Sequence, residues 1–352
     1  MDWLNELDTS HLLQVVEQQL QDMLPSFSVR QLFEQLLTGE LQLGFRDILQ
    51  QLGQVVWTAA TAQFDLLGQL ILLAIAFAVL RQMEGSFSSS NIQKMSGLVI
   101  QAVTVLLILQ SSRLVLADCQ QAITRLTALM EALLPLQLLL MAGLGNVKTA
   151  GLLQPSLLVM VQFTAFCFQK ILMPLITMEL LLKLVNSFSD TYRLTGLAAF
   201  LRKVILTAIS FSIMLFLAIL SIQGISGQAL DRLSLQALKY VTGNAIPVVG
   251  GMLSGMLGTL LSGGLLIRNA IGFVGLLVVL LLTVLPALKI LILYFLYSFA
   301  AALLQPLGDS RMITLMEQTA GSFMLAFAVV TLTGVLFFFM ILIVLAASGT
   351  SL

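Results

Sequence analysis

The run Ile271-Gly-Phe-Val-Gly-Leu-Leu-Val-Val-Leu-Leu-Leu-Thr-Val-Leu285 decides the fold class of this chain. It lies within residues 269–288, which contain no Asp, Glu, Lys or Arg. A membrane-spanning helix needs roughly 20 mostly apolar residues, so this segment is long enough to cross a bilayer. Backbone N–H and C=O groups find no water in lipid, and an unbroken apolar run satisfies them only as a helix. A β-barrel strand would instead alternate apolar and polar residues over about ten positions.

Similar runs recur along the 352-residue chain, of which 59% is hydrophobic and only 10% is charged. A soluble domain carries about 25% charged residues. Mean hydropathy is +1.01. Further segments without a charged residue are 149–169, 204–230, 240–267 and 318–352. The predicted fold class is therefore all-α, a polytopic bundle of membrane helices.

We predict seven to nine crossings of the membrane. The predicted spans are residues 66–80, 97–113, 126–143, 156–185, 203–222, 265–285, 286–304 and 319–347. The segment 156–185 is long enough for one very long helix or for two short ones divided near Lys170 to Pro174. The predicted transmembrane domain covers residues 65–352.

Residues 1–64 form a predicted acidic head of amphipathic helices. Residues 1–65 contain nine Asp and Glu side chains against Arg30 and Arg46, whereas the rest of the chain has an excess of Lys and Arg. Because Lys and Arg concentrate in short cytoplasmic loops, we expect the head on the extracytoplasmic face. Its apolar stripes fit packing within the chain or on the bilayer, or else a docking surface for a partner. An acidic head also lacks the basic patch of a nucleic-acid-binding protein.

The segment from Val241 to Gly264 is too rich in glycine to be one straight helix. Residues 243–264 contain seven glycines, and Pro247 lies among them. Irregular backbone at membrane depth survives only where protein or a water-filled cavity covers it. We expect a re-entrant hairpin here. The alternative is a close contact between two helices through Gly251 and Gly255, which are four residues apart.

No enzyme signature survives inspection. Gly224-Ile225-Ser226-Gly227 resembles the motif of intramembrane serine proteases. That chemistry needs a histidine base, and the single histidine, His11, lies in the acidic head. A zinc protease motif would require two histidines. The chain is therefore predicted not to be an enzyme, and we predict no cofactor and no metal site.

Five ionisable side chains lie inside apolar stretches, namely Glu131, Lys170, Glu179, Lys183 and Lys289. Such residues are costly in lipid and usually face the bundle interior or water. Glu179 and Lys183 are four residues apart, which places them on one helical face as a candidate ion pair. Lys289 has no acid in its own span, so it needs a distant partner, snorkels or lines a cavity. We expect Lys289→Ala to impair function more than Lys183→Ala.

Three segments carry a resemblance to a known family. They are Lys239-Tyr-Val-Thr-Gly-Asn-Ala-Ile-Pro-Val-Val-Gly250, Pro286-Ala-Leu-Lys-Ile290 and Ala301-Ala-Leu-Leu-Gln-Pro-Leu-Gly308. They closely resemble the stage III sporulation protein AE family of endospore-forming bacteria, over roughly residues 65–345, with a weaker match in the head. The resemblance marks seven residues for a pore-lining or conformational role, namely Gly243, Asn244, Pro247, Gly250, Lys289, Gln305 and Pro306.

The resemblance also implies a function that composition does not supply. Family members are made in the mother cell and sit in the membrane around the engulfed forespore. They work there with the other stage III AA to AH proteins and the forespore stage II Q protein. Together these proteins form a channel or secretion-like apparatus required for forespore development. We expect a non-enzymatic, multi-pass subunit of that complex, embedded in the bilayer and able to form homo-oligomers, with no nucleic-acid partner.

Two other classes of function fit the residues. A secondary transporter for a small solute would account for broken helices, a faint internal repeat and the lone Lys289. A membrane scaffold that recruits other channel proteins would need only the loops and the head. Substrate-dependent flux in liposomes would favour the transporter. Loss of partner recruitment after loop changes, with no effect of changes at Lys289 or Gly250, would favour the scaffold.

Overall fold

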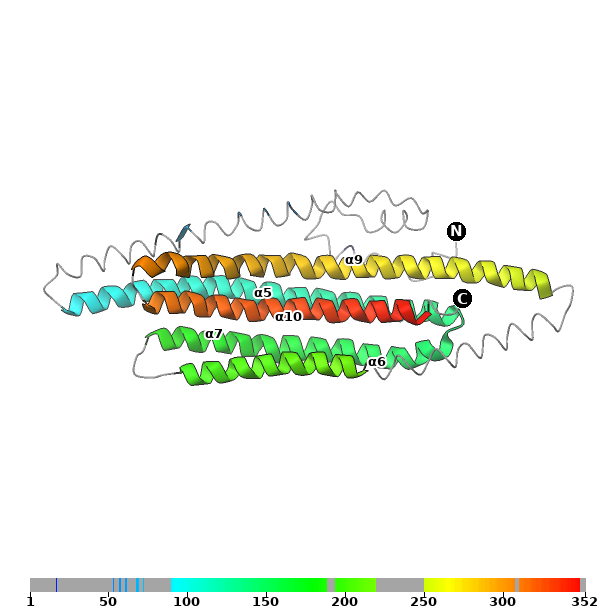
Figure 1. Ribbon diagram of the computed structural model, residues 1–352, viewed down its shortest axis with the longest axis horizontal. Coiled ribbons are helices and arrows are strands. Elements are labelled where there is room, and N and C mark those ends of the chain that lie inside the picture. The colour runs from blue at the N-terminus through cyan, green and yellow to red at the C-terminus, as the bar shows by residue number, and fades with distance from the viewer. Residues whose placement is uncertain are drawn as a thin grey trace.

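The computed structural model is an elongated bundle of long helices (Figure 1). It describes residues 90–188, 194–219, 250–307 and 310–348, with a few isolated positions between residues 17 and 72. Every regular element in the described ranges is helical. The acidic head, the predicted span 66–80 and the segment 220–249 lie outside these ranges. The division of the chain at residue 65 therefore stays a prediction.

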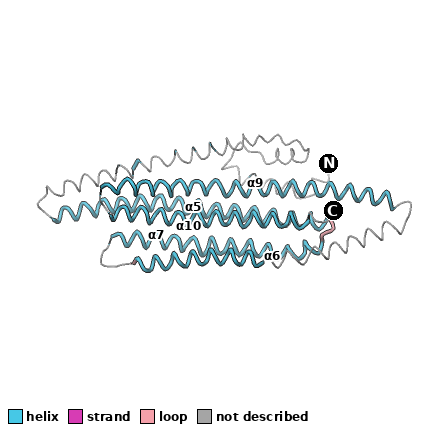
Figure 2. The backbone as a smooth tube through the Cα atoms, in the orientation of Figure 1, coloured by secondary structure: helices cyan, strands magenta, loops and turns pink. Residues whose placement is uncertain are grey.

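The chain runs back and forth along the bundle axis. The elements in order are α5 (Ser90–Gly143), α6 (Val147–Ala165), the π-helix η1 (Phe166–Leu172), α7 (Met173–Phe188), the helix Thr195–Ile219, α9 (Gly250–Leu304), the short 3₁₀-helix η2 (Gln305–Leu307) and α10 (Ser310–Ser348). Figure 2 shows the short loop through which α5 turns back into α6. This turn uses Gly145 at a φ of 94°, a left-handed conformation that glycine adopts without steric cost.

Five helices in the described ranges are long and apolar enough to cross a membrane. They are Gln101–Gly143, Val147–Phe188, Thr195–Ile219, Gly264–Leu304 and Arg311–Ala347. They confirm the all-α class and fit a membrane protein. They do not confirm seven to nine crossings.

The predicted divisions within two of these helices are wrong. α5 continues through residues 114–125, which separate the predicted spans 97–113 and 126–143. α9 continues through Pro286, which separates the predicted spans 265–285 and 286–304. Charged and polar residues can end an apolar segment and still be good helix formers. Proline is tolerated in membrane helices because neighbouring helices and local adjustments satisfy the freed backbone groups.

The glycine-rich segment is regular from Gly250 onwards. α9 begins at Gly250 and includes Gly251 and Gly255, so the predicted hairpin or break is wrong for residues 250–264. A helix satisfies its own backbone hydrogen bonds, and this gain outweighs the poor helix propensity of glycine. A close approach that needs glycine occurs instead at Gly264, where an added Cβ would lie 2.7 Å from the Leu144 side chain.

The segment from Val147 to Phe188 is one continuous helical run. It includes the predicted span 156–185, and η1 covers the part of it from Phe166 to Leu172. The sequence left open one very long helix or two short ones divided near Lys170 to Pro174. The structure has the long helix, with a change of helical hydrogen bonding close to the expected division.

Packing is closest where glycines face large side chains. α9 and α10 form the most extensive pair in the bundle, and they run antiparallel. An added Cβ at Gly334 of α10 would lie 2.0 Å from the Thr283 hydroxyl of α9. One at Gly275 of α9 would lie 2.5 Å from Leu133 of α5. These contacts let the three helices enclose a continuous core of Leu, Val, Ile and Met side chains.

Candidate functional site

A buried carboxylate lies on the face of α7 that packs against α10. Glu179 has a fully buried side chain. α7 buries Met173, Ile176, Leu180 and Leu184 at three- and four-residue spacing, and Glu179 lies on the same face. An isolated buried carboxylate is very costly, so the partners of Glu179 decide whether the helices can pack here.

Lys183 and Ser322 supply two of these partners. Lys183 Nζ forms an ion pair with Glu179 Oε1 one turn away on α7. Ser322 Oγ of α10 donates a hydrogen bond to Glu179 Oε2 at 2.6 Å. Lys183 Nζ also lies 3.1 Å from Ser322 Oγ and donates to the Gln318 carbonyl at 3.2 Å. The four-residue spacing thus brings Glu179 and Lys183 together, and α10 completes the site.

Arg202 approaches the same carboxylate from the helix Thr195–Ile219. Its Nη1 lies 3.9 Å from Glu179 Oε1, and 42% of its side chain is exposed. The guanidinium lies close to Gly321, where an added Cβ would be 3.0 Å from Arg202 Nη1. The small residue at 321 leaves room for the arginine against α10. We call Glu179, Lys183, Arg202 and Ser322 the ionic cluster.

A pocket opens beside the ionic cluster, between α7, the helix Thr195–Ile219 and α10. Its volume is about 180 Å³, and its lining includes Glu179, Lys183, Asn186, Thr195, Arg202 and Gln318. Since a water molecule occupies about 30 Å³ of liquid, the pocket has room for several waters or a small solute. The pocket combines two cationic groups with one carboxylate, so it carries a net positive charge.

The chemistry that this site offers is electrostatic. Among the described residues, no three His, Cys, Asp or Glu side chains form a group able to hold a metal ion. The pocket lining contains no cysteine and no histidine. The arrangement can hold charge inside the helix bundle and can attract an anionic or polar group to the pocket.

The other predicted site residues do not gather at one place. Gly250, Gly251 and Gly255 lie in the first turns of α9, whereas Gln305 and Pro306 are exposed in η2 at its opposite end. These ends are about 80 Å apart at 1.5 Å of rise per residue. Gly243, Asn244 and Pro247 lie outside the described residues.

Lys289 lies between these ends of α9. Its side chain is half-buried, and the structure has no hydrogen bond or ion pair between it and another described residue. It is about 50 Å along the helix from Gly255. The predicted pore-lining or conformational residues that the structure describes are therefore spread along α9 and η2.

Glu131 and Lys170 lie on the surface shared by α5 and the α6–η1 run, and both are exposed. Gln162 Nε2 of α6 donates to Glu131 Oε1 at 2.5 Å. Gln169 Nε2 of η1 donates to Thr124 Oγ1 of α5 at 3.2 Å. Two side-chain hydrogen bonds therefore link α5 to its neighbour along this surface.

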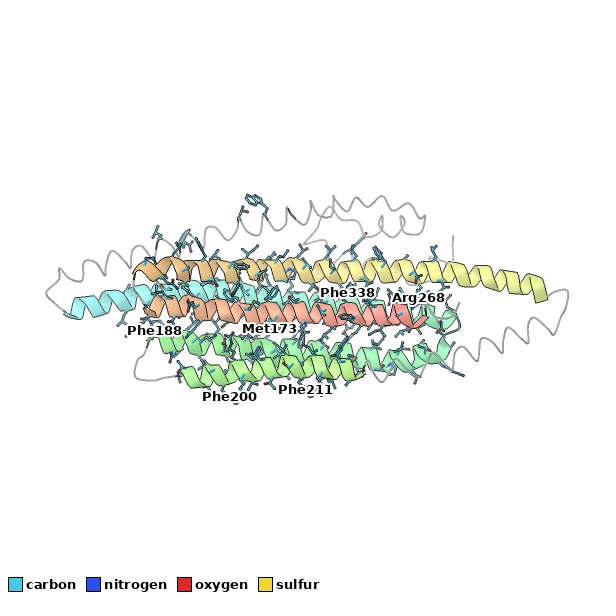
Figure 3. All side chains as sticks on the ribbon, viewed as in Figure 1. Met173, Phe188, Phe200, Phe211, Arg268 and Phe338 are labelled. Atoms are coloured by element: carbon cyan, nitrogen blue, oxygen red, sulfur yellow. The ribbon has the colours of Figure 1, made fainter. Side chains whose placement is uncertain are left out.

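Sequence reasoning missed a second buried charge. Arg268 lies on α9 (Figure 3), and its side chain is fully buried. One guanidinium nitrogen donates to the Val344 carbonyl and lies 3.4 Å from the Leu345 carbonyl. A cation near the C-terminus of α10 is favourable, because the last carbonyls of a helix have no partner within it. The signal was present, since Arg268 is the single charge between residues 240 and 288.

The family model described as Stage III sporulation protein AE matches residues 27–348, beginning inside the acidic segment. The chain is similar to "Stage III sporulation protein AE" of Bacillus subtilis (strain 168), with 30% identity over 330 residues. That match covers 94% of this chain and 82% of the relative. No solved structure matches the chain significantly.

Proposed function

The chain belongs to the stage III sporulation protein AE family, and from this premise we propose that it is an integral membrane subunit of the channel or secretion-like complex that links mother cell and forespore. The observation that carries the proposal is the family match over most of the chain, together with the five long apolar helices in its described part. Bundles of this kind satisfy their backbone hydrogen bonds inside lipid and can build a passage through it. Forespore development would depend on this passage.

The proposed location and partners follow from family membership. The protein would lie in the mother-cell membrane that surrounds the forespore. Its partners would be the other stage III AA to AH proteins and, indirectly, the forespore stage II Q protein. Residues 1–64 would form an extracytoplasmic head available for these contacts. Residues 65–352 would form the membrane domain. The residues in pore-lining or conformational roles would be Gly243, Asn244, Pro247, Gly250, Gly251, Gly255, Lys289, Gln305 and Pro306.

The proposed role is non-enzymatic. The ionic cluster holds charge between three helices, and its one hydroxyl, Ser322 Oγ, is buried and bonded to Glu179. Its contribution would be to fix α7, α10 and the helix Thr195–Ile219 against one another. A fixed bundle is what a channel subunit needs at its contacts with other subunits.

One observation favours a second candidate function, transport of a small solute. The pocket of about 180 Å³ beside the ionic cluster is lined by charged and amide groups, and it lies between apolar helices. Ionisable residues within membrane helices commonly mark substrate or ion pathways. A transporter would bind an anionic solute at Arg202 and Lys183. Arg202→Ala would then abolish substrate-dependent flux in liposomes while leaving complex assembly intact.

The experiment that tests the sporulation role uses the full chain in its own host. Deleting the gene should stop development after engulfment and lower late forespore transcription, measured with a forespore reporter. A tagged copy should restore both and co-purify with other stage III proteins from sporulating cells. Normal spore yield in the deletion strain, or a tagged chain recovered without these proteins, would refute the proposal.

A further inference from the structure

One side of the bundle is mostly polar across the middle of its length, and its α5 part most completely so. On α5, the exposed positions between Leu114 and Leu139 include no large hydrophobic side chain. We call the following exposed side chains of α5, α6 and η1 the polar edge: Gln120, Gln121, Thr124, Glu131, Gln162 and Lys170. The α6–η1 side of this edge also exposes two apolar side chains, Val159 and Phe166. At about 1.5 Å per residue, the stretch between the two leucines is about 37 Å long.

The helix α9 has an apolar surface at the same level. Tyr297 lies beside Ser111, Gly275 beside Leu133 and Gly264 beside Leu144, so the two helices run antiparallel in a constant register. The α9 segment from 275 to 297 thus lies alongside residues 111–133 of α5. Its exposed large side chains are Leu280 and Phe295, and its one charged side chain is the half-buried Lys289. Different sides of the bundle therefore present opposite chemistry at one depth.

Wherever a bilayer is placed along the bundle, part of the polar edge lies at the depth of its hydrocarbon core. The apolar segment Gly264–Leu304 has 41 residues, whereas the hydrocarbon core needs about 20. The first half of that segment lies beside residues 124–144 of α5, and the second half lies beside residues 104–124. Either half therefore brings part of the polar edge into the hydrocarbon. Charged and amide groups facing lipid at this depth are strongly unfavourable.

The groups of the polar edge are also poorly suited to a dry protein interface. Glu131 accepts a hydrogen bond from the neutral amide of Gln162, and no cation among the described residues pairs with it. For Lys170, the structure has no ion pair with another described residue. Enclosing unpaired charges between packed side chains is strongly unfavourable, because each ion loses its hydration and gains no partner. Water stabilises the same charges without a protein partner.

We infer that the polar edge faces a water-filled conduit enclosed by several copies of this chain. The interior of each bundle is filled by its core, so a path must run outside the bundle, along its polar side. A second copy is the surface that can close such a path, because it presents the same polar edge with charges of both signs. The inference rests on the proposed channel function and assigns the wall of the passage to α5, α6 and η1.

Accessibility of single cysteines to a charged thiol reagent tests the inference. The native thiols Cys119 and Cys167 are free, so both are first replaced by alanine. Gln121→Cys and Thr124→Cys then report on the polar edge in membranes from sporulating cells. Leu280→Cys, at a similar depth on α9, is the matched control for a surface that faces lipid. A membrane-impermeant methanethiosulfonate ammonium reagent is the probe.

We expect the two cysteines on the polar edge to react at least about tenfold faster than Cys at 280, because the reactive thiolate forms in water. Equal, slow reaction at all three positions would overturn the inference and would indicate a dry interface or cover by residues 1–89. Reaction in membranes that lack the other stage III proteins would support the water-lined edge even if the sporulation role failed. If a chain that co-purifies with those proteins reacts slowly at both positions, the sporulation role is still supported, but the polar edge does not face a water-filled conduit.

Discussion

The ionic cluster and the polar edge both place charges among apolar helices, but they stabilise them in different ways. In the ionic cluster, Glu179 is fully buried and is contacted by Lys183 and by Ser322 at 2.6 Å. On the polar edge, Glu131 is exposed and has a single amide partner, Gln162. A charge withdrawn from solvent depends on each protein partner, whereas an exposed one depends on water. The same substitution should therefore have very different effects in the two regions.

The largest effect should come from removing the lysine of the ionic cluster. Lys183→Met leaves Glu179 buried with only the more distant Arg202 as a cation, and we expect a loss of about 4 kcal/mol in the free energy of unfolding. Thermal unfolding in detergent measures it. The double variant Glu179→Leu/Lys183→Met should recover most of the loss, because an apolar pair has no charge to satisfy. Wild-type stability of Lys183→Met would contradict the difference between the two regions.

The contacts of Lys183 also reverse the order of importance expected from the sequence. Lys183 has three polar partners, whereas Lys289 has none among the described residues. We now expect Lys183→Ala to lower spore yield more than Lys289→Ala. A larger defect for Lys289→Ala would point to a role of that side chain in the passage itself.

Removing a single hydroxyl from the ionic cluster should have the next largest effect. Ser322→Ala deletes the donor to Glu179 Oε2, and hydrogen bonds to charged groups are each worth about 2 kcal/mol. The same thermal measurement applies, with Ser156→Ala as the control, because Ser156 bonds only carbonyls of its own helix. Equal stability of the two variants would mean that Lys183 alone satisfies the carboxylate.

A neutral hydrogen bond inside the core should matter less. Ser111 Oγ and Tyr297 Oη are 2.5 Å apart and buried between α5 and α9. Tyr297→Phe keeps the ring against Phe323 and removes the hydroxyl, so we expect a loss of about 1 kcal/mol. Ser111 keeps its bond to the Ile108 carbonyl. A loss of stability as large as that of Lys183→Met would show that charge does not explain the greater sensitivity of the ionic cluster.

The smallest effect on stability should occur on the polar edge. Glu131→Gln removes a charge that is already exposed, and exposed ion pairs contribute less than about 1 kcal/mol. Its consequence should appear in the passage instead, as a change in the cation preference of current through reconstituted complexes. A large loss of stability with unchanged current would place Glu131 in a protein interface.

The sequence predicts the class of this fold well because lipid imposes a rule on every residue. An uncharged run such as residues 269–288 has no stable form in a bilayer other than a helix, and α9 contains it. The ends of the helices are predicted less well than the fold class. Residues 114–125 of α5 are polar enough to end a predicted span, yet they continue the helix because polarity and helix propensity are separate properties.

The same limit applies to the ionic cluster, of which only the part that lies on one helix can be predicted from the sequence. The spacing of Glu179 and Lys183 places them on one face of α7, which sequence alone can predict. Ser322 and Arg202 join them only through the packing of α10 and the helix Thr195–Ile219, far away in the chain. The glycines at 250, 251 and 255 misled the prediction, because glycine indicates freedom of the backbone without saying whether that freedom is used.

The π-helix η1 predicts where members of this family can gain or lose one residue in this helical segment. α6 turns Gln162 toward α5, whereas α7 turns Glu179 toward α10, and η1 is the joint between these two faces. Each residue of a helix rotates the following part by about 100°. Deleting one residue from α7 would swing Glu179 away from Ser322, whereas a π-turn arises from an extra residue and can lose it again with little disturbance. Single-residue gaps between relatives should therefore fall within Phe166–Leu172, while the neighbouring helices keep their length.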